Sequence, residues 1–113
     1  MNTNRRRTAR RKRQRSHGDR AGTYRLPAHV QAWAIARAAP LRGLVAEHEG
    51  LPAPPELASA IQKTRQAIRF LDEVANGRRP FVPATGVQGA VLLEEASDAW
   101  ARWADALEEG KVA

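Results

Sequence analysis

The residues best able to do chemistry form a cationic run between positions 4 and 15. Eight of these twelve residues carry a positive charge, and seven of the eight are arginines. An arginine side chain offers five donors in a planar fork that matches a phosphate group bidentately, whereas lysine offers a point charge. The run therefore predicts nucleic-acid binding through eight side chains: Arg5, Arg6, Arg7, Arg10, Arg11, Lys12, Arg13 and Arg15.

The arrangement of these charges favours RNA over DNA. In a helix they would surround the axis and leave no apolar face, so an amphipathic membrane helix is not expected. A cationic rod instead suits a narrow anionic groove, such as the RNA major groove where a bulge or loop opens it. The run of arginines at 5–7 and 10–11 resembles the arginine-rich motifs of viral RNA-binding proteins and of phage transcription antiterminators. This resemblance covers twelve of the 113 residues and implies structured RNA as the partner.

Two other interpretations of the run stay open. A targeting segment, or a tail that binds an acidic protein, has a similar composition, and so does a solvated charge run with no dedicated partner. The abundance of alanine, glycine and proline is also consistent with high-GC coding, which favours arginine over lysine without any role in binding. Nucleic-acid binding is the leading hypothesis among these.

A second candidate contact is the segment Arg78-Arg79-Pro80-Phe81, in which two arginines lie beside an aromatic ring. Arginine can contact phosphate, and an aromatic ring can stack on a base. We therefore keep Arg78, Arg79 and Phe81 as a secondary nucleic-acid site. The simpler interpretation, which we favour, is a connection between two helices with Phe81 packed into the core.

No arrangement of residues in the sequence predicts catalysis, a metal site or a cofactor. The histidines at 17, 29 and 48 have no second histidine or cysteine at ligand spacing. The acidic residues between 94 and 109 fall opposite the apolar seam of a predicted helix, which is typical of a solvated face. That face is also suited to holding the basic run intramolecularly. Because the sequence contains neither a glycine-rich phosphate loop nor a nucleophile with a base, we expect a protein that is not an enzyme.

Charge and hydropathy divide the chain near residue 25. The 113 residues contain 19 Lys or Arg and 12 Asp or Glu, for a formal net charge of +7. Residues 1–25 carry +9 of this charge, and residues 26–113 carry −2. All 24 Leu, Ile, Val, Phe and Trp residues also lie in the second part. Because a segment without large apolar side chains cannot offset its ordering entropy by burial, we expect a disordered tail over 1–25 and a helical domain over 26–113.

The composition excludes several classes of protein. The absence of cysteine excludes a disulfide framework and a cysteine-bound metal. No apolar run reaches the ~18–20 residues that a membrane-spanning helix needs, and the N-terminus shows no apolar signal segment. We therefore expect a soluble cytoplasmic protein with no membrane partner.

The periodicity of the second part predicts helices throughout. Residues 28–39 are rich in alanine, and Pro40 is expected to break or kink this helix, so that a second short helix can start there and run to Gly50. Residues 55–75 place apolar side chains every three or four positions, and Asn76-Gly77 is expected to end that helix. A last helix is expected from a capping box at 85–88 to about residue 109.

The two long helices, 55–75 and 85–109, have matched apolar seams and should form an antiparallel hairpin. The fold class we expect is all-α: a small three- to four-helix bundle built on that hairpin, with a disordered arginine-rich N-terminal tail. Trp100 and Trp103 lie one turn apart on the last seam. We expect them in the core, with a dimer seam as the alternative.

The sequence as a whole favours a small regulatory or accessory protein that binds nucleic acid through its basic tail. The helical domain would supply dimerisation or a contact to a larger protein complex, and a homodimer is compatible with its seams. The alternative is a helical protein–protein interaction module or inhibitor whose basic tail is incidental. In that case function would follow exposed apolar positions such as Trp33, Phe81 or Trp103 rather than the arginines.

Overall fold

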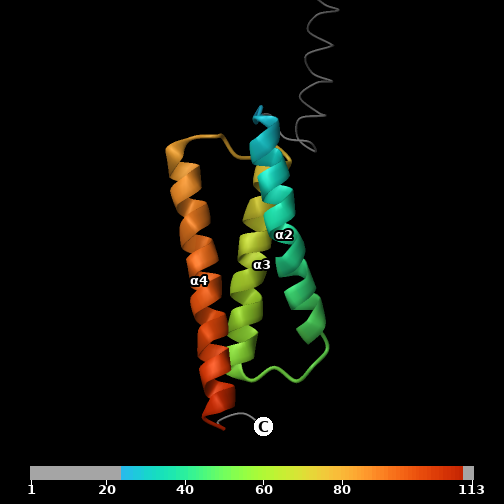
Figure 1. Cartoon of the computed structure of the whole chain (residues 1–113), viewed down its shortest axis with the longest axis vertical. Coiled ribbons are helices and arrows are strands. Elements are labelled where there is room, and N and C mark those ends of the chain that lie inside the picture. Colours follow the sequence, from blue (N-terminus) through green and yellow to red (C-terminus); the bar gives the residue numbers. More distant parts are fainter. Residues whose placement is uncertain (1–23, 111–113) are drawn as a thin grey trace, which may run out of the picture.

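The computed structural model describes residues 24–110, which form three α-helices (Figure 1). Helix α2 spans Ala28–His48, α3 spans Pro55–Ala75 and α4 spans Pro83–Glu108. The described part of the chain contains no strand, so the predicted all-α class is confirmed. None of these three helices is both long and apolar enough to cross a membrane. The predicted disordered tail of residues 1–25 lies almost wholly outside the described residues.

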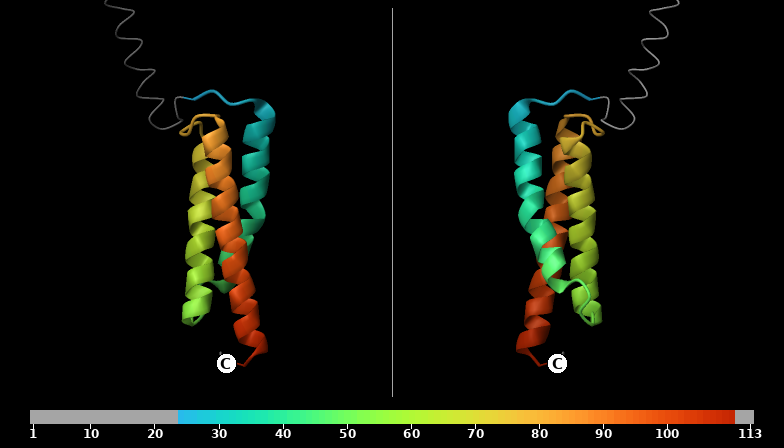
Figure 2. Two further views of the ribbon diagram at one scale, coloured as in Figure 1. Left: turned by 90° about the vertical axis from the view of Figure 1, so that its left-hand side faces the viewer. Right: turned by 90° about the vertical axis from the view of Figure 1, so that its right-hand side faces the viewer.

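Helix α3 is the element on which the other two helices pack. Both α2 and α4 contact α3, whereas the backbones of α2 and α4 do not approach each other. The chain reverses direction at each connection, so that α2 and α4 run in the same direction and begin at the same end of the molecule (Figure 1, Figure 2). Residues 76–82, which connect α3 to α4, lie at this end, called the loop end below.

Helix α2 passes through Pro40 without ending, so the prediction of two separate helices in this region is wrong. A proline inside a helix removes one backbone hydrogen bond, here the one that residue 40 would donate to the carbonyl of Ala36. Both residues lie on the exposed side of α2, where water reaches that carbonyl. Ala34, Ala38 and Val45 are buried before and after Pro40. This continuous packing holds the helix together.

Helix α3 has the bounds that the sequence predicts. Pro55 occupies its first turn, where the missing N–H needs no partner. At its other end Gly77 adopts a φ of +68°. The N–H groups of Gly77 and Arg78 donate to the carbonyls of Val74 and Glu73 at 3.1 and 2.8 Å. These two bonds satisfy terminal carbonyls of the helix, and they require the left-handed backbone that glycine adopts readily.

Helix α4 begins two residues before the predicted capping box. Pro83 stands in its first turn, and no side chain caps the helix. Thr85 instead donates its hydroxyl hydrogen to the carbonyl of Pro80 at 2.7 Å. The predicted capping box is therefore wrong, because proline, whose φ is already helical, begins the helix and Thr85 binds the preceding loop.

The core of the helical part is built mainly from small side chains. Eight of the thirteen buried apolar residues in the described range are alanines, which lets the helices approach closely. The fully buried Thr64 donates its hydroxyl hydrogen to the carbonyl of Ala60 and accepts the indole N–H of Trp100, both at 2.7 Å. The rings of Trp100 and His48 lie 5.0 Å apart. Trp100 therefore contacts all three helices, whereas Trp103 is half-buried beside a hollow.

Candidate functional site: an apolar cleft at the loop end

An apolar cleft of about 360 Å³ opens between α2 and α4 at the loop end. It exists because α2 and α4 each pack on α3 but not on each other. Its walls come from α2, from α3, and from the loop together with the first turns of α4. The lining residues are Val30, Trp33, Phe70, Val74, Phe81, Val82, Pro83, Thr85, Gly86 and Gly89.

The floor of the cleft is the contact between Phe70 of α3 and Gly89 of α4. Phe70 is buried, and a Cβ atom at position 89 would lie only 2.8 Å from its Cε1 atom. Carbon atoms at their optimal separation are ~3.5–4.0 Å apart, so the ring occupies the space that any side chain at position 89 would need. The glycine thus allows α4 to sit close to the phenyl ring.

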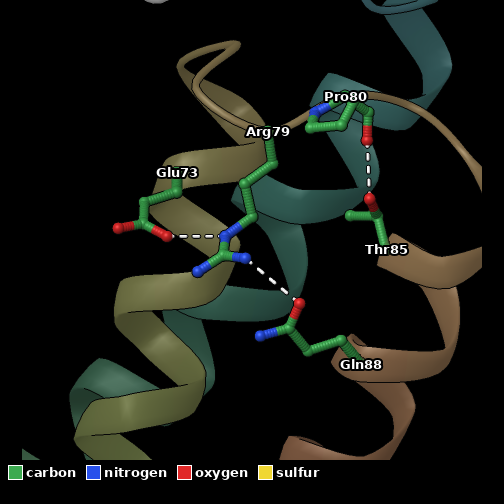
Figure 3. Close-up of polar contacts among 5 residues, drawn as sticks. All are labelled: Glu73, Arg79, Pro80, Thr85 and Gln88. Atoms are coloured by element: carbon green, nitrogen blue, oxygen red, sulfur yellow. Dashed lines mark hydrogen bonds and ion pairs between the residues drawn. The ribbon is translucent and has the colours of Figure 1, made fainter.

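The loop wall of the cleft is held by Arg79. Its Nε donates to Oε1 of Glu73 on α3 at 2.6 Å, and one terminal nitrogen donates to Oε1 of Gln88 on α4 at 3.1 Å (Figure 3). Its guanidinium carbon also lies 4.7 Å from the centroid of the Phe70 ring, in cation–π contact. One side chain therefore ties the loop to both helices and to the floor of the cleft.

Phe81 follows directly in this loop and is 58% exposed. The bond from Thr85 to the carbonyl of Pro80 and the fixed φ of Pro80 and Pro83 restrict the backbone on either side of it. An aromatic side chain whose backbone is already ordered loses less entropy when a partner covers it. The loop end thus presents a preorganised aromatic residue beside the cleft.

The cleft is suited to an apolar group and not to a charged one. Its lining contains no Asp, Glu, Lys, Arg or His, and the Thr85 hydroxyl already donates to Pro80. The volume is at the lower end of the ~300–1,000 Å³ typical of ligand pockets, which suits one bulky side chain. Covering the exposed halves of Trp33 and Phe81, roughly 100 Å² each, would contribute about 5 kcal/mol at ~25 cal/mol/Å².

The predicted site residues have different outcomes. The eight cations between positions 5 and 15 lie outside the described residues. Arg78 is exposed, whereas Arg79 is only one-third exposed and is engaged with Glu73 and Gln88. The expectation that Phe81 is packed in the core is wrong, because Phe70 already fills the space between the loop, α3 and Gly89.

Two other surface features are the acidic side chains of α4 and a second hollow away from the cleft. Glu94, Glu95, Asp98, Asp105, Glu108 and Glu109 are all exposed, as expected for a solvated face. Whether they hold the basic run intramolecularly concerns residues that the structure does not describe. The second hollow is more open and lies at the far end, between the α2–α3 connection and the last turns of α4. Across residues 24–110, no group of three or more His, Asp or Glu side chains is placed to hold a metal ion.

The cleft itself has no local signature in the sequence, because it joins Trp33 to residues about fifty positions later. One signal is nevertheless present. The first nine residues of α2, 28–36, and the first eleven of α4, 83–93, contain no Asp, Glu, Lys or Arg. An uncharged stretch at the start of two helices indicates an apolar surface wherever the fold places those starts together.

Comparisons of the chain with models of protein families, with curated proteins and with solved structures find no match.

Proposed function

We propose that this chain is a small, non-enzymatic regulatory or accessory protein that binds nucleic acid, RNA in preference to DNA, through its arginine-rich N-terminal run. The helical part, built on the α3–α4 hairpin, docks to protein. The observation that carries this proposal is the separation of charge. Residues 1–25 hold +9, whereas residues 26–113 contain nine basic and eleven acidic side chains, a net charge of −2.

The arginines of the helical part support this division. Arg42, Arg65 and Arg79 form ion pairs with Asp72, Glu49 and Glu73 respectively. An arginine in such a pair would have to leave its carboxylate before it could bind a phosphate. This pairing weakens three of the helical part's cations as phosphate ligands, and the N-terminal run is the only dense cluster of cations in the sequence. With six to eight phosphate contacts, the affinity of that run for a polyanion falls by about 10³–10⁴ between ~50 and ~200 mM salt.

The chain enters the helical part at the loop end, beside the cleft. The N–H of Tyr24 donates to the carbonyl of Gly77 at 2.9 Å, which anchors the chain at the loop end. The chain between Arg15 and Tyr24 can span at most about 30 Å, whatever its conformation. Nucleic acid held by residues 5–15 is therefore kept within a short distance of the cleft.

Fluorescence anisotropy with a hairpin RNA, a DNA duplex and a single-stranded RNA tests the proposal. The full chain is compared with two variants in which the seven arginines between positions 5 and 15 are all changed to glutamine or all to lysine. We expect the glutamine variant to lose binding to all three probes. The lysine variant keeps the charge and should keep binding to polyanions, but lose the preference for the hairpin, because lysine lacks the planar fork. Binding by the glutamine variant that equals that of the full chain would refute the proposal.

A second candidate function is favoured by the cleft. In this alternative the chain is a helical protein-interaction module or inhibitor and the basic run is incidental. The half-exposed Trp33 and Phe81 on opposite sides of an uncharged cleft support it. One comparison of the activity of variants in cells distinguishes the two functions. The alternative predicts that Trp33→Ala or Phe81→Ala loses this activity and that the glutamine variant keeps it.

A further inference from the structure

Helix α2 has an apolar surface on more sides than its packing uses. Its residues show almost no separation into an apolar and a polar face, yet the only helix its backbone approaches in the described part is α3. Trp33, which lines the cleft from α2, is 51% exposed. The first nine residues of α2 contain no Asp, Glu, Lys or Arg, and an uncharged stretch that exposes a large aromatic side chain is typical of an interaction surface. The surface formed by α2, the cleft and α4 is therefore expected to be covered.

The remainder of this chain is unsuited to covering it. Residues 1–23 contain no Leu, Ile, Val, Phe or Trp, and residues 111–113 contribute only one valine. Nucleic acid is also a poor occupant, because the cleft lining has no charged side chain and the nearby Arg79 is bound to Glu73 and Gln88. The occupant that fits is another protein surface of apolar character.

We propose that this occupant is a second copy of the same chain, related by a two-fold axis that runs parallel to the helices. Since α2 and α4 run in the same direction from the loop end (Figure 1, Figure 2), such an axis sets α2 of each copy against α4 of the other at the same level. The two surfaces differ in size in a complementary way. Trp33 is a large, half-exposed side chain on α2, whereas α4 offers the small, exposed Gly86 and Ala90 at a similar distance from the loop end.

The charges beside these residues are complementary as well. Arg37 follows Trp33 by one helical turn, and Glu94 follows Ala90 by one turn, so each lies beneath the residue it follows. From the helix rise, Arg37 lies about 14 Å along α2 and Glu94 about 17 Å along α4. Both are exposed, and neither forms an ion pair within the described range. The two-fold axis brings Arg37 of each copy within reach of Glu94 of the other, twice in the dimer.

The size of the surface is adequate for a stable dimer. Two helices side by side make a face about 30 Å long and about 20 Å wide, or about 600 Å² in plan. Side-chain relief brings this towards the ~800 Å² per partner that specific complexes bury. The absence of Asp, Glu, Lys and Arg from residues 28–36 and 83–93 also removes like-charge repulsion from the half of this face at the loop end.

The dimer has a consequence for nucleic-acid binding. Because both copies begin α2 at the same end, two arginine-rich runs leave the dimer together, and one nucleic acid can bind both with increased avidity. This consequence rests on the proposed function. Dimerisation itself is measured without nucleic acid, so that the failure of one is distinguished from the failure of the other.

Sedimentation equilibrium of the full chain from about 1 µM to about 1 mM tests the dimer. We expect a reversible dimer whose dissociation constant rises at least about 30-fold with Trp33→Ala, as for a central aromatic contact. Ile35→Ala is the matched control, because Ile35 is equally exposed but lies about 200° around α2 from Trp33. Circular dichroism checks that both variants keep their helices. A chain that stays monomeric throughout overturns the proposal and leaves a different protein as the occupant, and equal effects of the two variants overturn it too.

A charge exchange tests the orientation of the two copies. Arg37→Glu alone and Glu94→Arg alone each place like charges in both contacts and should weaken the homodimer about tenfold. A mixture of the two variant chains restores opposite charges at both contacts. We expect this heterodimer to form with a dissociation constant within about threefold of the unmodified dimer. A mixture that associates no better than either variant alone would overturn the two-fold arrangement.

Discussion

Substitution of Gly89 by alanine tests the contact on which the cleft is built. A methyl group at this position would lie 2.8 Å from Cε1 of Phe70, so the ring must retreat by about 1 Å to reach ordinary contact distance. The ring is only 4% exposed and has the Arg79 guanidinium 4.7 Å from its centroid, which limits that movement. Overpacking of this kind costs about 1–3 kcal/mol, whereas alanine gains about 0.8–1 kcal/mol over glycine inside a helix. We expect a net destabilisation of about 1 kcal/mol.

Gly43→Ala is the matched control for this substitution. Gly43 is also inside a helix, but a Cβ atom there meets nothing within 4 Å, so the variant should be more stable by about 0.8 kcal/mol. Urea denaturation of both variants at one protein concentration measures the difference, expected at about 2 kcal/mol. Equal stabilisation by the two alanines would contradict the close seating of Phe70 on Gly89 and with it the shape of the cleft floor.

Two further substitutions test other parts of the fold. Thr64→Val keeps the shape of the buried side chain but removes the acceptor of the Trp100 indole N–H. It should lower the free energy of unfolding by about 1–2 kcal/mol and change the tryptophan emission. Unchanged stability and emission would contradict the hydrogen bond between α3 and α4. Pro40→Ala restores the missing N–H donor to the Ala36 carbonyl inside α2. It should raise the free energy of unfolding by about 1–3 kcal/mol, which is measured as a higher midpoint of thermal unfolding. A lower midpoint would show that proline is required for the shape of α2.

The elements with strong local signals are predictable from the sequence. Helix α3 begins with proline, ends at Asn76-Gly77 and has apolar positions at regular spacing, and all three signals agree. Pro40 misleads because propensity is a local property, whereas the burial of Ala34 and Ala38 against α3 depends on the whole fold. Burial of these alanines overrides the local preference for a break.

The cleft is not predictable in the same way. Its shape depends on the distance between α2 and α4, which is set by how each packs on α3. The exposure of Phe81 likewise depends on tertiary contacts. Phe70, with Arg79 stacked over its ring, occupies the space beneath the loop that Phe81 would otherwise fill. The local sequence shows that Phe70 and Phe81 are both apolar, but it does not indicate which of the two is buried.

The salt dependence of RNA binding tests the central proposal most directly. The slope of log K against log salt concentration is measured for the full chain and for the variant with the seven arginines of positions 5–15 changed to glutamine. Six to eight phosphate contacts predict a slope of about −4 to −7 for the full chain, whereas the one cation of the run that the variant keeps, Lys12, predicts a slope of about −1. A steep slope that survives the loss of these arginines would contradict the proposal, because the polyanion site would then lie in the helical part of the chain.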